Sequence, residues 1–160
     1  MGYMKEIERK FLVDTDKLPV LPEPMRLQQG YLALGPTVRV RTQEGPGAMQ
    51  KAYLTIKGSG AIARDEFEYE IPQYEALQLL DLAHGSVVSK KRYHLPVGGH
   101  PELKWELDIF EGDNAGLVVA ELEMPNPDLE FEHPVWLGQD VTSDGRYKNA
   151  ALSQNPYKNW

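Results

Sequence analysis

At 160 residues, with 41% hydrophobic and 26% charged side chains, the chain has the size and composition of a single globular domain spanning residues 1–160. It contains no cysteine, which excludes disulfides, thiolate metal ligands and cysteine nucleophiles. The formal net charge of −7 argues against nucleic acid as a partner, because such binding needs basic groups that neutralise phosphates. The apolar runs are too short to span a membrane and the N-terminus lacks the apolar core of a secretion signal, so we expect a cytoplasmic protein without a membrane partner.

The first predicted strand, residues 3–13, carries the charge pattern on which the functional interpretation depends. Side chains alternate between the two faces of a strand, so Glu6, Glu8 and Lys10 share one face while Ile7 lies on the other. Glu6 and Glu8 would lie about 6.6 Å apart along the strand, within reach of one hydrated divalent cation. Taken alone, the pattern is also typical of a mixed-charge solvent face, so its interpretation depends on the rest of the chain.

Most of the remaining chain consists of short alternating runs bounded by Gly and Pro, which is the pattern of β-strands. We predict further strands over 25–34, 37–42, 49–57, 63–71, 86–95, 102–110 and 117–124. The spacing of Leu77, Leu80 and Ala83 predicts a helix over about 74–84. Shorter helical segments are expected over 14–18, 126–130 and about 143–154.

Eight strands joined by short connections favour antiparallel pairing, and eight is also the strand number of a small closed barrel. The expected fold is therefore mainly β (α+β). We predict an eight-stranded antiparallel closed β-barrel tunnel with a few peripheral helices.

Charged and apolar side chains alternate on most of these strands, and the sign of the charge differs from strand to strand. One interpretation is a solvated outer face around a packed interior. Segregation of the signs by strand, and the small number of helices available to cover an apolar exterior, favour a charged lumen instead. Ionised groups in a lumen need partners, and a polyphosphate with a divalent metal supplies partners for both signs. The basic members are Arg39, Arg41, Lys57, Lys90 and Arg92, and the acidic members are Glu66, Glu68, Glu70, Glu106, Asp108, Glu121 and Glu123.

Taken together, these residues resemble the CYTH superfamily, the triphosphate tunnel metalloenzymes, whose Glu-x-Glu-x-Lys signature corresponds to Glu6, Glu8 and Lys10. The resemblance extends in order along essentially the whole chain. The length and the ending 146–152 resemble the short, single-domain bacterial type, which implies inorganic triphosphatase activity. The matching segments are 6–10, 30–32, 38–41, 54–57, 66–69, 90–93, 106–110, 120–123, 141–142 and 146–149.

The resemblance implies hydrolysis or cyclisation of a triphosphate with Mg²⁺ or Mn²⁺ in the lumen. The phosphate-binding residues that it implies are Lys10, Arg39, Arg41, Lys57, Lys90 and Arg92. The metal ligands that it implies are Glu6, Glu8, Glu121 and Glu123, with Glu68 and Asp108 as further carboxylates.

The nucleophile in such a hydrolysis is water, activated by a metal or by a base. Lys90 is the candidate base, because its pKa should fall among neighbouring cations and beside Tyr31. The alternatives are that Lys90 is one more phosphate ligand and that Tyr31 is a packing aromatic.

Three function classes are compatible with these residues. The first is a metal-dependent triphosphatase that cleaves inorganic triphosphate to pyrophosphate and phosphate. The second is another enzyme on the same fold: a class IV adenylate cyclase, a thiamine-triphosphatase or a nucleoside triphosphatase. The third is a non-catalytic polyphosphate-binding module. No base pocket for a cyclase is evident, and a pure anion binder gains nothing from the four glutamates of the implied metal site. A monomer and a homodimer are both compatible with the sequence.

Overall fold

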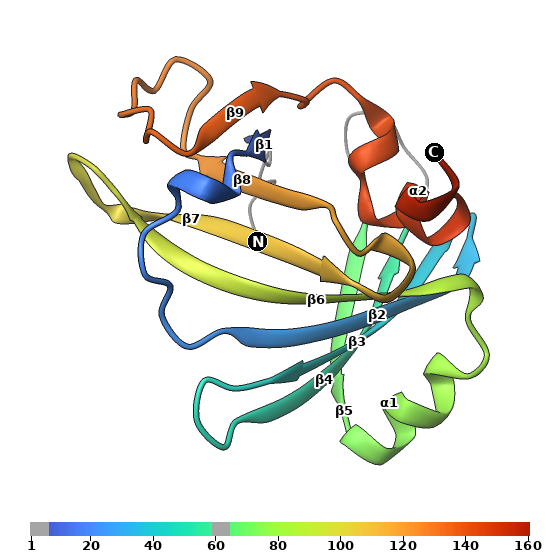
Figure 1. Ribbon diagram of the computed structural model, residues 1–160. Helices are drawn as coiled ribbons and strands as arrows, with labels where there is room; N and C mark the ends of the chain where they lie inside the picture. The colour runs from blue at the N-terminus through green and yellow to red at the C-terminus, as the bar shows by residue number, and fades with distance from the viewer. Residues whose placement is uncertain (1–6, 59–64) are drawn as a thin grey trace.

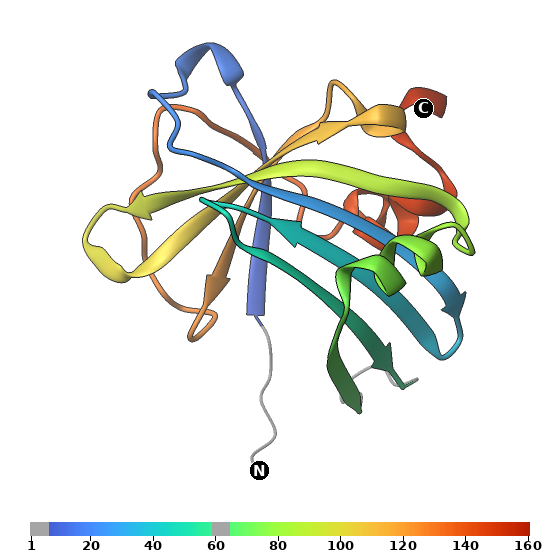
Figure 2. The same ribbon diagram turned by 90° about the horizontal axis from the view of Figure 1, so that it is seen from below.

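The structure is a computed structural model that describes residues 7–58 and 65–160. Its main feature is one antiparallel sheet of nine strands in the order β5-β4-β3-β2-β6-β7-β8-β1-β9. The sheet is strongly curved, so that the strands wrap partly around a common interior (Figures 1 and 2). The strands are β1 (Ile7–Val13), β2 (Met25–Leu34), β3 (Thr37–Glu44), β4 (Gln50–Lys57), β5 (Glu66–Ile71), β6 (His84–Val97), β7 (His100–Glu111), β8 (Val118–Met124) and β9 (Leu137–Asp140).

Two short α-helices accompany the sheet, α1 (Gln73–Leu80) and α2 (Asn149–Gln154). Helix α1 contacts β2, β3 and β4, whereas α2 contacts mainly β6, and the two helices lie on opposite sides of these strands in Figure 1. The remaining helical turns are the 3₁₀ segments η1 (Thr15–Lys17), η2 (Gly112–Asn114), η3 (Gly145–Tyr147) and η4 (Tyr157–Asn159).

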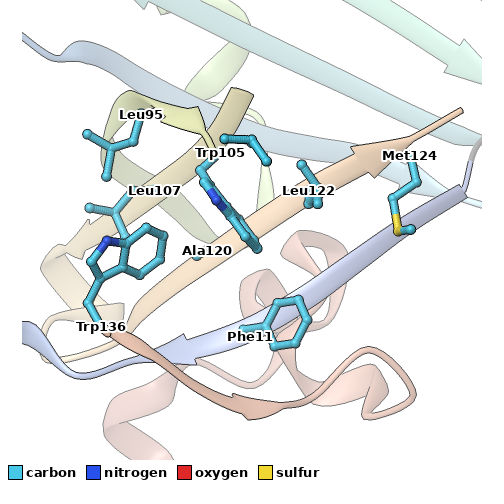
Figure 3. Packing of buried hydrophobic residues seen from close by; sticks show 9 residues of the cluster. Phe11, Leu95, Trp105, Leu107, Ala120, Leu122, Met124 and Trp136 are labelled. Atoms are coloured by element: carbon cyan, nitrogen blue, oxygen red, sulfur yellow. The ribbon is translucent and has the colours of Figure 1, made fainter. Parts of the chain in front are cut away.

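The alternation of side chains places two of the three apolar clusters on the outer face of the curved sheet. The third cluster, which joins Val88 and Val119 to Leu152 of α2, lies on the same sheet face as Lys90 and Glu121. The largest cluster gathers residues of β1, β6, β7 and β8 around Trp105, and the segment leading into β9 covers it with Trp136 (Figure 3). The rings of Trp105 and Trp136 meet edge to face at 5.4 Å, and the ring of Phe11 lies 5.8 Å from that of Trp105, the preferred geometry of aromatic pairs. A second outer cluster packs Ala76 and Leu80 of α1 against Val40 and Ala52. The intervening side chains therefore point into the interior.

The mainly β, antiparallel architecture predicted from the sequence is confirmed, with one strand more than expected. The additional strand, β9, pairs with β1 through Phe11 opposite Asp140 and Val13 opposite Leu137. Closure into a tunnel stays a prediction, because β5 and β9 are the outer strands of the sheet within the described residues.

Three helical predictions differ from the structure. The helix predicted over about 74–84 is α1, which ends at Leu80, and His84 already begins β6. Residues 126–130 form a turn, in which the Asn126 side chain accepts a hydrogen bond from the Asp128 amide at 3.1 Å, so the predicted cap closes on itself without a helix behind it. The segment predicted as one helix over 143–154 is divided into η3 and α2, because Lys148 between them is extended, with φ −69° and ψ 141°.

Candidate functional site

The concave face of the sheet encloses a polar cavity of about 470 Å³. Seven cationic and six anionic side chains line it. They come from β1 and from β3 to β8, with Lys148 directly before α2, while β2 contributes the uncharged Gln29 and Tyr31. A wider opening of about 730 Å³ adjoins it, since Glu66, Glu106 and Glu123 line both spaces. The charged residues of the cavity are Glu8, Lys10, Arg39, Arg41, Lys57, Glu66, Glu68, Lys90, Arg92, Glu106, Glu121, Glu123 and Lys148.

Arg39 and Arg41 enter the cavity from β3 because they flank Val40, whose side chain is fully buried in the outer cluster. Their register places Arg39 opposite Tyr31 of β2 and Arg41 opposite Gln29. Burial, followed by the charges of Arg39 and Arg92, lowers the pKa of Arg41. Two cations side by side in a partly desolvated space destabilise one another unless an anion joins them.

Three buried donors in this part of the cavity have no hydrogen-bond partner among the described residues. They are the Nε atoms of Arg39 and Arg41 and the amide nitrogen of Gln29. Buried donors are normally satisfied, and each one that is not costs about 1–3 kcal/mol. An anion with several oxygen acceptors would satisfy all three, so this wall of the cavity fits a phosphate-containing ligand.

Lys90 and Arg92 of β6 share one carboxylate, that of Asp108 on β7. Lys90 Nζ lies 2.8 Å from Asp108 Oδ2, and Arg92 donates from Nε and Nη2 to Oδ1 and Oδ2 at 2.8 and 2.9 Å. Burial lowers the pKa of Lys90 to about 8 in spite of Asp108, and Arg92 adds to the effect. Burial alone would raise the pKa of Asp108, but the two cations outweigh it and lower that pKa to about 2.

The acidic side of the cavity is formed where β1 pairs with β8. Glu8 lies opposite Glu123 and Lys10 opposite Glu121 in the register. Burial raises the pKa of Glu121 to about 7, helped by the hydrogen bond that its protonated form donates to Glu8 and by the charge of Glu8. Two carboxylates competing for one proton form a donor set that suits a hard divalent cation. Glu6, the other half of the signature, lies outside the described residues, and within 7–58 and 65–160 no three acidic or histidine side chains converge into a complete metal site by themselves.

The C-terminal part of the chain contributes one edge of the cavity. Lys10 Nζ donates to the Tyr147 carbonyl at 3.1 Å, and Lys90 Nζ donates to Asn149 Oδ1 at 3.1 Å. Lys148 and Asn149 line the cavity directly. The C-terminal residues hold this edge in place, since the Trp160 ring packs edge to face on that of Tyr147 at 5.1 Å.

A family model described as the CYTH domain matches residues 4–154. The chain belongs to the CYTH domain family. It is 43% identical over 160 residues to an inorganic triphosphatase of Acetivibrio thermocellus, with 98% of this chain and 97% of the relative covered. It is 38% identical over 161 residues to an inorganic triphosphatase of Nitrosomonas europaea, with 94% and 97% covered. The crystal structure of the inorganic triphosphatase NE1496 superposes with a TM-score of 0.71 at 33% identity, covering 95% of this chain and 97% of that one.

This CYTH domain brings most of the residues predicted from the sequence into one cavity. All six predicted phosphate ligands line it, as do Tyr31 and four of the six predicted metal ligands, Glu8, Glu68, Glu121 and Glu123. Asp108 does not line the cavity; it lies behind Lys90 and Arg92 and is 4% exposed. In the described part of the chain, no helix is long and apolar enough to span a membrane.

The CYTH cavity also contains residues that the sequence did not assign to the site. Gln29, Thr55 and Lys148 are polar residues whose sequence context is not distinctive. Thr55 and Gln29 had a usable signal, because each lies two residues from a predicted site residue on the same strand face. Lys148 follows a 3₁₀ turn, where no strand or helix periodicity indicates the direction of a side chain.

Proposed function

We propose that this chain hydrolyses inorganic triphosphate to pyrophosphate and phosphate with the help of Mg²⁺ or Mn²⁺. The single observation that carries the proposal is one cavity that combines six carboxylates with buried arginine and glutamine donors, which have no hydrogen-bond partner among the described residues. The names of the curated relatives and of the structural neighbour agree with it. Polar and charged side chains dominate the lining of the cavity, and the relatives are named inorganic triphosphatases, so the proposal specifies an inorganic substrate.

The cations supply most of the binding of the substrate. A triphosphate carries roughly four negative charges near neutral pH, since terminal phosphate groups titrate near pH 6. Arginine forks and lysine ammonium groups match phosphate oxygens, and positioning together with charge neutralisation is most of what phosphoryl transfer requires. In this proposal the phosphate-binding residues are Lys10, Arg39, Arg41, Lys57, Lys90 and Arg92.

The carboxylates of β1 and β8 would hold the metal. Glu8, Glu121 and Glu123 are the members of that set within the described residues, Glu6 would extend it, and Glu68 lies across the cavity on β5. A bound divalent ion supplies charge neutralisation at the phosphate oxygens and acidifies water. Phosphate oxygens would complete its coordination, which accounts for a donor set that is not complete from side chains alone.

Lys90 is the proposed general base. With a pKa lowered to about 8, roughly one tenth of Lys90 is neutral at pH 7, which suits a group that accepts a proton near neutral pH. The oxygen of water attacks the terminal phosphorus, the bond from that phosphorus to the bridging oxygen breaks, and the proton of water goes to Lys90 Nζ. Tyr31 keeps its phenolic proton, because burial raises its pKa, and is therefore a neutral hydrogen-bond donor in the cavity.

A phosphate-release panel tests this function. Purified protein is assayed with tripolyphosphate, pyrophosphate, ATP and thiamine triphosphate, each with Mg²⁺, Mn²⁺, Ca²⁺ or chelator. We expect tripolyphosphate with Mg²⁺ or Mn²⁺ to be the best combination, chelator to abolish turnover, and Ca²⁺ to support it poorly because of its larger radius and looser geometry. Formation of cyclic AMP from ATP faster than tripolyphosphate cleavage, or no hydrolysis with any metal, would refute the assignment.

A further inference from the structure

We infer that Asp108 is a positioning residue, which fixes the ammonium of Lys90 and the guanidinium of Arg92 for the reaction, and that it is not a metal ligand. The inference rests on the proposed function, because the two cations that it holds are those assigned to phosphate binding and proton transfer. Arg92 and Asp108 are direct cross-strand neighbours between β6 and β7, so the contact is built into the sheet register.

The oxygens of Asp108 are already engaged with cations. Oδ1 accepts from Arg92 Nε at 2.8 Å, and Oδ2 accepts from Arg92 Nη2 at 2.9 Å and from Lys90 Nζ at 2.8 Å. A divalent ion bound to this carboxylate would lie within a few ångströms of two full positive charges in a buried site, where repulsion is strong. The side chain of Asp108 is only 5% exposed, and Asp108 is not among the residues that line the cavity. Asp108 therefore serves the two cations and leaves the metal to the carboxylates of β1 and β8.

The contacts determine the direction in which Lys90 presents its ammonium. Of its three hydrogen positions, one is directed to Asp108 and a second to Asn149 Oδ1 at 3.1 Å. The Phe110 ring, 5.3 Å from Nζ, occupies a further side. Because Lys90 also lines the cavity, the remaining position is directed to the cavity contents. A lysine with four rotatable bonds is held in this way in one orientation.

Arg92 is fixed just as completely. Besides its two bonds to Asp108, its Nη1 lies 2.6 Å from Glu106 Oε2. The carboxylates of β7 thus hold Arg92 from two sides. Removal of Asp108 would leave Arg92 on Glu106 alone, and Lys90 would lose its only carboxylate partner among the described ion pairs. The expected defect is one of geometry, for which a displacement of about 1 Å reduces turnover by about 100-fold.

The test uses Asp108→Asn, which keeps the size of the side chain and removes its charge. We expect kcat for tripolyphosphate to fall by about 100-fold. The affinity for Mn²⁺, measured by electron paramagnetic resonance without substrate, should stay within about threefold of the wild-type value, which is the size of effect expected from a substitution that touches no metal ligand. Glu8→Gln is the comparison for lost metal affinity. In a Lys90→Met background, Asp108→Asn should cost much less than in the wild type, because a residue that acts through Lys90 has little left to position.

Asp113→Asn is the matched control, because Asp113 also bonds a lysine, Lys158 at 2.9 Å, but outside the cavity. Its turnover should equal that of the wild type. If Asp108→Asn fails to fold, Asp108→Glu keeps the charge and moves the oxygens by one methylene, and the same loss of kcat with retained Mn²⁺ affinity is expected. A tenfold loss of Mn²⁺ affinity in either variant, unchanged turnover, or full additivity with Lys90→Met would each overturn the inference. Absence of tripolyphosphate hydrolysis by the wild type would refute the proposed function instead, and the Mn²⁺ affinities would still decide whether Asp108 is a metal ligand.

Discussion

The cations of the cavity fall into two groups according to how they are held. Lys90 and Arg92 are fixed by carboxylates and buried, whereas Arg39 and Arg41 keep a buried Nε without a partner in the described residues. Groups of the first kind are suited to orienting the reacting phosphate, and groups of the second kind gain most when an anion arrives. We therefore expect the two rows of cations to have different roles, although the sequence pattern does not distinguish them.

A substitution of Lys57 tests whether a cavity cation without a fixed carboxylate contributes mainly to binding of the anion. It lies at the end of β4 opposite Glu66 and Thr37 and lines the cavity. For Lys57→Ala we expect tripolyphosphate affinity, measured by calorimetry, to fall by about 10- to 100-fold, the worth of one hydrogen bond to a charged group. The thermal midpoint should change by less than about 2 °C, because the cation is repelled by its neighbours when no anion is bound. Lys51→Ala, an exposed site on the same strand, is the control. A large loss of stability with unchanged affinity would contradict the expected role.

Glu121 gives a prediction about pH. Burial and Glu8 raise its folded-state pKa to about 7 from the ordinary value of 4.5, so between these values the folded protein holds a proton that the unfolded chain has released. The resulting stabilisation is fully present below pH 4.5 and is lost as the pH rises through 7. In chelator, the thermal midpoint of the wild type relative to Glu121→Gln should therefore fall as the pH rises from 4.5 to above 7. A difference that is flat or increasing over this range would show that Glu121 is not a buried, proton-sharing carboxylate.

At the scale of elements, eight of the nine strands were predictable, whereas their pairing partners were not. Alternation along β3, β6, β7 and β8 places charge on one face and apolar side chains on the other, and the segregation of the signs by strand favoured the charged face as the one that forms the cavity. Strand β9 has the sequence Leu-Gly-Gln-Asp, which lacks β-branched residues and alternation. It is a strand because Gly138 allows the backbone to approach that of β1: a Cβ on Gly138 would lie 2.9 Å from the Leu12 carbonyl oxygen. Such tertiary contacts are not visible in a local pattern.

The packing of α1 on the sheet depends on another close approach. A Cβ on Gly30 of β2 would lie 2.8 Å from the Cβ of Ala83 and 3.1 Å from a methyl group of Leu80. Gly30→Ala should therefore push the end of α1 away from the sheet and lower the free energy of unfolding by about 1–3 kcal/mol, the usual cost of overpacking. Chemical denaturation measures this. Gly145→Ala is the control, since nothing lies within 4 Å of the added methyl. Equal stability of the two variants would mean that α1 does not rest on Gly30.

For the molecule as a whole, the sequence predicted which residues lie in one cavity but not the burial and the contacts of each. Lys10, Arg39, Lys57 and Glu121 share the concave face because strand periodicity requires it. Periodicity could not separate Asp108 from Glu106, because both point to the same face of β7, whereas only Glu106 lines the cavity and Asp108 is buried behind Lys90 and Arg92. Alternation predicts the sheet face to which a side chain points. Its burial and its contacts depend in addition on its depth in the curved sheet and on residues 147–149, which are distant in sequence and contact Lys10 and Lys90.

The charge of the whole molecule leads to the last prediction. A protein with a net charge of −7 repels a polyphosphate at long range, so any binding must come from the concentrated cations of the cavity. Bound tripolyphosphate would join β1, β3, β4 and β6 through their cations, and it binds the folded state only. At a concentration about 100 times its Kd, it should stabilise the fold by about 2.7 kcal/mol, which raises the thermal midpoint of a domain of this size by about 5–10 °C.

Differential scanning fluorimetry in chelator measures this shift without turnover. Sulfate at matched ionic strength is the control, because it can satisfy one phosphate position only and should shift the midpoint far less. Lys57→Ala should need a higher tripolyphosphate concentration for the same shift, whereas Lys51→Ala should follow the wild type. If sulfate and tripolyphosphate raised the midpoint equally, or if neither did at any concentration, the cations of the concave face would not form one extended polyphosphate site, and the charges of the separate strands would act independently.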